Sequence, residues 1–306
     1  DGRPGDVAAA PEAEVEISAD LVARLLAHQL ADSPSPGLAG LVGQPLRPAG
    51  SGWDNVLYRL GDAHAVRLPR RRVAVELLLN ERRFLPRLAP GLPLPVPEPV
   101  FAGRPGRGYP WPWSVTGWLP GDPADLSSPA PEASTALAEF LLALHRPAAD
   151  DAPWNSHRSV ALRDKAPALA DRFRRLRAGA ELPPALDDVW RAAVEADIDR
   201  GPTWIHGDLH PQNVLVAGGR IAGVIDWGDL CAGDPATDLA AIWLLFDRTR
   251  DRAAALERYG ASEQTVRRAR GWALFFGVVF TDIGRVDKPR ELRLGRRALS
   301  NVLAGP

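Results

Sequence analysis

The chain has 306 residues, of which 45% are hydrophobic and 25% are charged, and its formal net charge at pH 7 is −1. This length and composition predict ample core, in one large domain or two modest ones. The near-zero charge creates no field that attracts nucleic acid or an anionic membrane, so neither is expected as a partner. The single cysteine, Cys231, excludes an internal disulfide. No secretory segment or long apolar run is visible, which predicts a cytoplasmic protein.

The first part of the chain predicts a flexible lead-in followed by a helix. Residues 1–14 are rich in Pro, Gly, Ala and acidic residues, a composition typical of mobile segments. Ser18 is a suitable N-cap for the helix that follows. Its apolar residues recur at helical spacing, at Leu21, Val22, Leu25, Leu26 and Leu30.

A β-hairpin is predicted next. Apolar residues alternate from Val56 to Leu60, Gly61-Asp62 turns the chain, and residues 65–68 continue as a second strand. The segment Ser51-Gly52-Trp53-Asp54-Asn55 leads into this hairpin. Its small residues suit either an ordinary turn or a loop whose backbone N–H groups bind phosphate.

Residues 73–89 then predict a helix with Val73, Leu77, Leu78, Phe84, Leu85 and Leu88 on its apolar side. The Pro-rich residues 90–100 predict an extended crossing, and residues 113–118 predict an apolar strand that ends near Leu119-Pro120-Gly121. From residue 131 onward the pattern becomes helical. Helices are expected at residues 131–145, 161–177, 184–198, 236–250, 251–259, 264–281 and 289–303.

Residues 204–229 carry the strongest chemical signal. Two short β-branched runs, 214–216 and 221–225, flank Gly218-Gly219, which predicts a tight hairpin with a type I′ turn. Asp208 and Asn213 precede the first strand, and Asp226 follows the second. Because a hairpin brings its open ends together, these three side chains are expected to meet.

Oxygen ligands beside a further carboxylate suit a hard cation, and Mg²⁺ is the usual choice where phosphate is bound. The pattern H-x-D-x-x-x-x-N, a hairpin and then D-x-G matches the catalytic part of the kinase phosphoryl-transfer template. In that template Asp208 orients and deprotonates an attacking hydroxyl, and Asn213 and Asp226 hold Mg²⁺ on the nucleotide phosphates. The plainer alternative is a polar hairpin whose Asp and Asn residues cap loops.

The motifs H-G-D-L-H-P-Q-N at 206–213, I-D-W-G-D at 225–229 and G-D-P-A-T-D-L-A at 233–240 resemble the aminoglycoside phosphotransferase family. The resemblance is specific here and weaker over the rest of the chain from about residue 45. It implies an α+β, two-lobed, protein-kinase-like fold with a β-rich amino-terminal lobe and a mainly helical carboxy-terminal lobe. Residues 1–116 would form the nucleotide-binding lobe, and residues 117–306 the hinge and the catalytic, acceptor-binding lobe.

The resemblance also implies a nucleotide site. Ser51, Gly52 and Asn55 would lie in the phosphate-covering loop, and Gly117, Trp118 and Leu119 would form the hinge that contacts the purine. The family has a lysine at the position of Arg67. This chain has no lysine in its amino-terminal part, because its only two lysines are Lys165 and Lys288. Arginine keeps the charge but differs in bulk and geometry. Its expected partner is Glu81, with Glu76 as the alternative.

Other residues of the carboxy-terminal half divide between acceptor contact and structural support. His210, Asp229, Trp243 and Trp272 are candidates for acceptor contact, although buried tryptophans are usually core residues. His206, Asp234 and Asp238 are expected to be structural, with Asp234 at a helix start and Asp238 bracing the catalytic loop. His145 is expected to make a structural hydrogen bond.

The sequence therefore predicts an ATP- or GTP-dependent, Mg²⁺-using kinase that phosphorylates a hydroxyl of a small molecule, as a monomer or weak dimer. By resemblance the acceptor is an aminoglycoside or related antibiotic, with resistance by inactivation as the result. A macrolide kinase, a housekeeping sugar or amino-alcohol kinase and a nucleotide-binding pseudokinase remain alternatives. An aminoglycoside requires converging carboxylates, whereas a macrolide requires an apolar pocket. The acidic candidates are Asp150, Asp151, Asp187, Asp188 and Asp282.

Overall fold

A computed structural model describes residues 12–179, 182–286 and 288–306. These residues divide into two compact units. The sheet unit comprises described residues up to 90 together with 95–119, and the helical unit comprises 91–94 and described residues from 120 onward. Residues 117–119, the expected hinge, therefore belong to the sheet unit rather than opening the second lobe.

The sheet unit is built on an antiparallel sheet with the strand order β1-β2-β3-β5-β4. Its strands are β1 (Leu46–Ser51), β2 (Asn55–Leu60), β3 (His64–Pro69), β4 (Pro99–Gly103) and β5 (Trp113–Gly117), and its helices are α1 (Ala19–Leu30), α2 (Pro36–Ala39) and α3 (Val73–Leu88).

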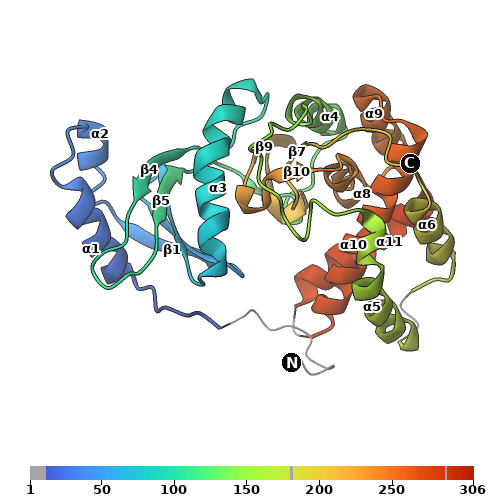
Figure 1. Cartoon of the computed structure of the whole chain (residues 1–306), viewed down its shortest axis with the longest axis horizontal. Helices are drawn as coiled ribbons and strands as arrows, with labels where there is room; N and C mark the ends of the chain where they lie inside the picture. Colours follow the sequence, from blue (N-terminus) through green and yellow to red (C-terminus); the bar gives the residue numbers. More distant parts are fainter. Residues whose placement is uncertain (1–11, 180–181, 287) are drawn as a thin grey trace. The chain divides into compact units, whose positions relative to one another are not determined.

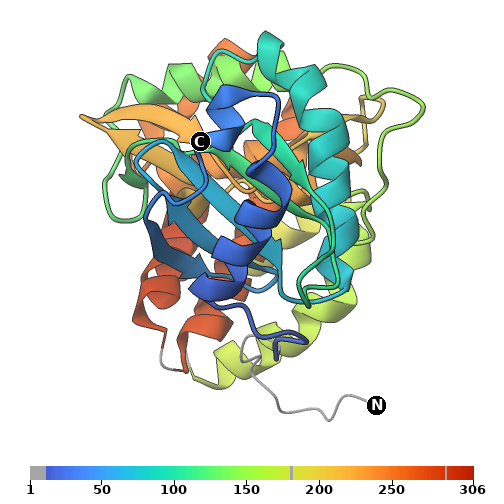
Figure 2. The same cartoon turned by 90° about the vertical axis from the view of Figure 1, so that its left-hand side faces the viewer.

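Alternation along the strands gives the sheet one apolar and one polar face. Tyr58 pairs with Val66, and Val66 pairs with Val115, so these side chains share the face that packs against α1. Figure 2 shows α1 lying across the strands on this face. Arg67 points to the opposite face, which is the side of α3 (Figure 1). The period-2 pattern of the hairpin therefore places Arg67 where α3 can reach it.

Local details of the sheet unit differ from the sequence predictions. Val73, expected on the apolar side of its helix, is 63% exposed, because the buried side of α3 begins at Ala74 and continues at Leu78. The strand β1 was not predicted, since its Pro and Gly residues hide it. Glu14 donates its N–H to the carbonyl of Arg70 and is thus fixed rather than part of a flexible lead-in. Residues 1–11 lie outside the described range.

In the helical unit several other helices pack around α10 (Glu263–Gly284), which lies along α11 (Pro289–Ala304) in Figure 1. Its other helices are α4 (Ala133–Leu144), α5 (Ala166–Ala178), α6 (Ala185–Val194), α7 (Ala236–Leu239), α8 (Ala241–Leu245) and α9 (Thr249–Tyr259). Short 3₁₀ segments include Leu162–Lys165, Pro211–Asn213 and Trp227–Asp229. None of the described helices has the length and apolarity needed to cross a membrane.

Two small antiparallel sheets carry the catalytic segment. One pairs β7 (Thr203–Ile205) with β10 (Cys231–Gly233), and the other has the order β6 (Asp122–Pro123), β8 (Val214–Ala217), β9 (Arg220–Val224). Gly218 and Gly219 at the β8–β9 turn have φ of 55° and 76°. Positive φ at both positions is what a type I′ turn requires, so the predicted hairpin is confirmed.

The predicted helix over residues 236–250 is wrong in its extent. It is broken into α7 and α8, and Phe246 is already extended, with φ −118° and ψ 120°. The fully buried Arg252 donates hydrogen bonds to the carbonyls of Phe246, Asp247 and Gly305. Those carbonyls are therefore satisfied without a continuing helix, an arrangement that propensity does not reveal.

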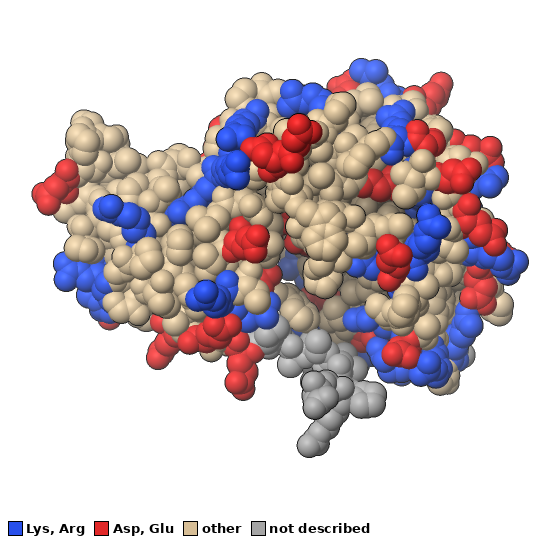
Figure 3. All heavy atoms as spheres, viewed as in Figure 1, with Lys and Arg blue, Asp and Glu red and all other residues tan. Residues whose placement is uncertain are grey.

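Basic and acidic side chains are interspersed on each unit over the face shown in Figure 3. No single sign of charge dominates that face. The distribution agrees with the formal net charge of −1.

Candidate active site

The β8–β9 hairpin brings Asn213 beside Asp226. Val214 pairs with Val224, and the N–H of Ile225 donates to the carbonyl of Asn213 over 2.9 Å. Asp226 is the next residue, and it is exposed. Its φ of 63° and ψ of 68° are left-handed values, which are uncommon for a non-glycine residue and concentrate at functional sites.

Asp208 lies on the loop after β7 with several donors around it. Arg158 Nη2 donates to Asp208 Oδ1 over 2.6 Å, and His210 Nε2 lies 3.3 Å from Oδ2. Asn213 Nδ2 donates to the Asp208 carbonyl over 2.9 Å. Burial would raise the pKa of Asp208, but the charges of Arg158 and His210 hold that pKa well below its usual range. Asp208 is therefore a carboxylate that can accept a hydrogen bond from a hydroxyl.

Asn213 and Asp226 have the oxygen donors that a hard cation prefers. The Nδ2 atom of Asn213 is engaged by Asp208, so its Oδ1 is the atom left for a cation. No cluster of three or more His, Cys, Asp or Glu side chains fit to hold a metal occurs among the described residues. A site of one amide and one carboxylate instead suits Mg²⁺, which keeps waters and takes further oxygens from substrate phosphates.

The backbone of the catalytic loop is braced by Asp238. Its carboxylate accepts the N–H groups of His206, over 2.6 Å, and Gly207, over 2.8 Å. His145 Nε2 lies 3.3 Å from the same carboxylate. His206 is fully buried, and its Nε2 lies 2.9 Å from the carbonyl of Ile225, which links the loop to β9. These are structural contacts.

Asp234 makes a similar contact at the start of α7. Its carboxylate accepts the N–H of Ala236 over 3.0 Å and also the guanidinium of the buried Arg268. The contact to Ala236 resembles an N-cap, although the helix formally begins after Pro235.

Gly207 is required by its backbone and by its neighbours. Its φ is +83°, and a Cβ at this position would lie 2.7 Å from the carbonyl oxygen of Asp229. Any other residue would be strained and would push the two loops apart. The glycine of the H-G-D motif thus allows the Asp208 loop to approach the segment after Asp226.

Arg158 and Asn155 are site residues that the sequence reading missed. Arg158 reaches Asp208 from a loop 50 residues earlier, and it also donates from Nε to Asp229 Oδ2 over 3.0 Å. Asn155 Nδ2 donates to the other oxygen of Asp229 over 2.9 Å. Neither residue belongs to a recognisable motif, so no sequence signal distinguished them from other loop residues.

The structure separates the four candidates for acceptor contact. Trp243 and Trp272 have no exposed surface and pack in the core, so they are corrected to structural residues. Asp229 is bound by Arg158 and Asn155, which makes it a support for the loop. His210 remains beside the catalytic carboxylate, and its ring lies edge-on to Phe280 of α10, with centroids 5.2 Å apart.

The sheet unit holds Arg67 between two partners. Arg67 forms an ion pair with Glu81 of α3, which is 1% exposed, whereas Glu76 is exposed at the surface. With the Asn55 amide oriented to satisfy its neighbours, its oxygen accepts from Arg67 Nη2 over 3.0 Å and from Nε over 3.2 Å. The choice between Glu76 and Glu81 is thereby decided for Glu81.

The loop before β2 is fixed by two further arginines. Arg70 donates to Ser51 Oγ and to the Gly52 carbonyl, each over 3.1 Å. Arg71 donates to the Trp53 carbonyl over 3.2 Å and pairs with Asp54. The segment is exposed from Ser51 to Trp53, so its outer surface is open to a ligand.

Two of the expected hinge N–H groups are used inside the sheet unit. The N–H of Gly117 donates to the carbonyl of Glu98 over 3.3 Å, and that of Trp118 donates to Ala63 over 2.8 Å. The N–H groups of Gly117 and Trp118 are therefore already engaged and are not available to a ligand.

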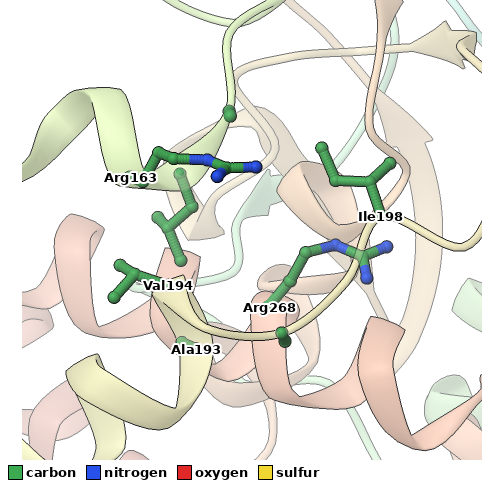
Figure 4. A pocket seen from close by; sticks show the side chains of 8 residues that line it. Arg163, Ala193, Val194, Ile198 and Arg268 are labelled. Carbon is green, nitrogen blue, oxygen red and sulfur yellow. The ribbon is translucent and has the colours of Figure 1, made fainter.

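Two hollows of the helical unit lie away from the candidate active site. A cavity of about 10 Å³, bordered by Arg163, Val194, Ile198 and Arg268, has space for one water molecule (Figure 4). A larger hollow of about 480 Å³ lies along α5 and α6, with Phe173 and Trp190 in its lining. Neither includes Asp208, Asn213 or Asp226, so neither is the catalytic site.

Comparison with known proteins gives a family and a curated relative. Residues 45–272 match the model of the phosphotransferase enzyme family. Viomycin phosphotransferase of Streptomyces vinaceus is 33% identical over 200 residues, which cover 60% of this chain and 68% of that protein. A match to the uncharacterized protein YcbJ of Bacillus subtilis covers only 18% of either protein.

Solved structures share the protein-kinase-like fold. The GDP complex of aminoglycoside 2′-phosphotransferase-IIIa aligns with a TM-score of 0.63 at 18% identity, over 92% of this chain and 97% of that one. Macrolide 2′-phosphotransferase MphH from Brachybacterium faecium aligns with a TM-score of 0.58 at 24% identity, over the same shares. At these identities the likeness concerns the fold: an α+β chain with a β-sheet amino-terminal part and a helical carboxy-terminal part.

Proposed function

Because the chain belongs to the phosphotransferase enzyme family, we propose that it transfers the γ-phosphoryl group of ATP or GTP to a hydroxyl of a small molecule, most simply an antibiotic. The observation that carries the proposal is the complete set of Asp208, Asn213 and Asp226 at one end of the β8–β9 hairpin. The carboxylate of Asp208 accepts a hydrogen bond from Arg158 and has its pKa held well below the usual range, and the other two residues offer hard oxygen donors.

Each catalytic residue has one task in this proposal. Asp208 accepts a hydrogen bond from the acceptor hydroxyl and takes up its proton as the oxygen attacks the γ-phosphorus, while the bond from that phosphorus to the β-phosphate oxygen breaks and the nucleoside diphosphate leaves. Asn213 Oδ1 and the Asp226 carboxylate would hold Mg²⁺, which when bound would neutralise charge on the phosphates. Asp238 and Gly207 keep the loop in place, so the hydroxyl is oriented before reaction.

Arg67 is proposed to contact the nucleotide phosphates from the sheet unit. Its partners Glu81 and Asn55 fix the direction of the guanidinium, as the glutamate does for a lysine in kinases. Ser51 and Gly52 present an exposed loop that suits phosphate, and Leu119 offers a backbone N–H for the purine.

The environment of the catalytic loop favours an acceptor with an apolar face. Three of the five acidic candidates are paired with arginines: Asp187 with Arg177, Asp188 with Arg191, and Asp282 with Arg172 and Arg175. On the side of His210 the loop meets the ring of Phe280. This arrangement supports a macrolide-like acceptor over the aminoglycoside that the sequence placed first.

A pseudokinase is the alternative from another class, and the missing lysine was its only support. Arg67 makes the glutamate pair that the lysine makes in kinases. A housekeeping sugar or amino-alcohol kinase shares the same catalytic groups and differs only in its acceptor.

The test is a phosphoryl-transfer screen of the intact chain with Mg²⁺ and either ATP or GTP. Aminoglycosides, viomycin, macrolides, simple sugars and amino alcohols are tried side by side, and phosphorylated product is detected by mass. We expect transfer to at least one antibiotic, with kcat reduced by about 10²- to 10⁴-fold in Asp208→Asn.

The matched control is Asp62→Asn, which changes an exposed aspartate in the turn between β2 and β3 and should leave kcat unaltered. Nucleotide binding without transfer to any acceptor, and an identical result with Asp208→Asn, would support the pseudokinase instead.

A further inference from the structure

We propose that Arg158 is a positioning residue that fixes the orientation of the catalytic Asp208 carboxylate and is itself held by Asp229, Asn155 and Phe276. This inference rests on the proposed function, because it concerns the same phosphoryl transfer. It assigns a role to four residues that the kinase template does not include.

The guanidinium of Arg158 spans two carboxylates. Nη2 donates to Asp208 Oδ1 over 2.6 Å, while Nε donates to Asp229 Oδ2 over 3.0 Å. Arginine is suited to this task because its donors lie in one rigid plane, so fixing one end of the plane fixes the other. A lysine has a single ammonium group and cannot impose a common orientation on both carboxylates.

Asn155 completes the support at the far end of the guanidinium. Its Nδ2 donates to Asp229 Oδ1 over 2.9 Å, and its Oδ1 accepts the backbone N–H of Arg158 over 3.2 Å. Its own N–H donates to Ser159 Oγ over 2.9 Å. Asn155 thus ties the backbone of Arg158 to the carboxylate that Arg158 grips, which makes the loop a closed hydrogen-bonded unit.

The ring of Phe276 of α10 packs against the guanidinium of Arg158. The Cζ atom of Arg158 lies 5.3 Å from the ring centroid of Phe276, within the range of a cation–π contact. Phe276 is itself almost fully buried, at 4% exposure, and packs against Trp272. The arginine is therefore anchored to the rigid core of the helical unit.

The consequence concerns which oxygen of Asp208 meets the acceptor. Oδ1 is engaged by Arg158, whereas Oδ2 lies on the side of His210 and Asn213, at 3.3 Å and 3.4 Å. Without Arg158 the carboxylate could rotate about its Cβ–Cγ bond and pair differently. A misplacement of about 1 Å at a reacting group costs on the order of 100-fold in rate. The loss should appear in kcat, because in this proposal Arg158 acts on the acceptor only through Asp208.

The experiment compares variants of the intact chain on the acceptor found by the screen. Arg158→Ala should lower kcat by about 100-fold and leave the KM for nucleotide and acceptor within about threefold of the parent values. Arg158→Lys should recover part of this loss, since it keeps one charged contact. Asp229→Asn should have a smaller effect, and Arg158→Ala combined with Asp229→Asn should be no slower than Arg158→Ala alone, because both act through one network.

Arg163→Ala is the matched control, since Arg163 is an exposed arginine on the same segment of chain and lies outside the network. It should keep the parent kcat. Each variant's folded fraction and Tm are measured in parallel, so that a loss of folded enzyme is not mistaken for slower transfer.

Several results would overturn the inference. A raised acceptor KM at unchanged kcat would make Arg158 an acceptor contact, and a kcat that falls only with the folded fraction would make it structural. If the losses of kcat in the two single variants added up in the double variant, Arg158 and Asp229 would act independently rather than through one network. If the parent transfers phosphate and Asp208→Asn abolishes the transfer while Arg158→Ala does not slow it, this inference fails and the proposed function stands. If the parent transfers to no acceptor, both fail.

Discussion

The catalytic segment of the helical unit and the Arg67 strand of the sheet unit hold their charged groups in different ways. Asp208, Asn213 and Asp226 come from one stretch of chain folded around a hairpin, and their loop is braced through backbone N–H groups by Asp238. The guanidinium of Arg67 on β3 is instead held by side chains, Asn55 of β2 and Glu81 of α3.

This difference predicts different sensitivities. Where the backbone is fixed, changing a single side chain removes one chemical group and leaves its neighbours in place. Where side chains hold one another, removing one releases the rest. The catalytic segment should therefore lose rate at preserved stability, and the Arg67 strand should lose stability and nucleotide affinity together.

The largest effect is expected from the cation site. Asp226→Ala removes a carboxylate that is proposed to hold Mg²⁺, and a bound cation contributes several kcal/mol of charge stabilisation in phosphoryl transfer, or roughly 10³-fold in rate. Removal of divalent cations by chelation should abolish transfer by the parent enzyme, and added Mg²⁺ should restore it. In Asp226→Ala, Mg²⁺ should restore little.

Initial rates across a Mg²⁺ titration, with the Tm of each protein, provide the measurement. A variant that regains the full rate at the parent's Mg²⁺ concentration would remove Asp226 from the cation site. If Asp226→Ala also lowered Tm as much as the variants of the Arg67 strand do, the predicted difference between the two regions would be wrong.

The second prediction uses two glutamates of the same helix. Glu81→Gln breaks a buried ion pair and leaves Arg67 without its anionic partner, which is expected to cost about 3 kcal/mol of stability and to raise the nucleotide KM about tenfold. Glu76→Gln is the matched control, because Glu76 is exposed on α3 and should alter neither quantity.

Chemical denaturation and nucleotide saturation curves measure the two effects together. If the two variants had the same free energy of unfolding and the same nucleotide KM, the ion pair of Arg67 would contribute nothing to nucleotide binding. A fall in kcat with unchanged KM would show that Arg67 acts in the transition state rather than in binding.

The smallest predicted effect separates backbone strain from contact in the catalytic loop. Gly207→Ala adds a Cβ 2.7 Å from the Asp229 carbonyl at a φ of +83°, so it should cost about 1–3 kcal/mol and slow transfer. Gly260→Ala has a similar φ of +70° with open space around the new Cβ, so it should cost at most about 1 kcal/mol and leave kcat unchanged.

Thermal unfolding and kcat of the two glycine variants decide the point. If both lose the same stability and neither loses rate, the close approach of Asp229 to the catalytic loop has no bearing on catalysis.

Much of the fold was accessible from short-range patterns. The α1 helix begins after its predicted N-cap, with Ser18 Oγ accepting the N–H of Leu21 over 3.2 Å. The β2–β3 and β8–β9 hairpins follow from alternation and from glycines at their turns. These features depend on residues that are neighbours in sequence, so local rules suffice.

The errors share a cause in distant contacts. The helix predicted over 236–250 stops at Leu245 because Arg252 satisfies the carbonyls that follow it, and the strand β1 forms by pairing with β2 despite its proline and glycines. Trp243 and Trp272 were counted as acceptor candidates because composition does not report which tryptophans are enclosed.

By itself the sequence indicated a phosphotransferase, because Asp208, Asn213 and Asp226 lie in motifs around one predicted hairpin, within 19 residues of chain. It also predicted the hairpin that carries Arg67. Only the tertiary structure decided that Glu81 rather than Glu76 faces Arg67, and that Arg158 reaches Asp208 across 50 residues. Those pairings depend on how helices and loops pack. Sequence periodicity does not report contacts between residues that are far apart along the chain.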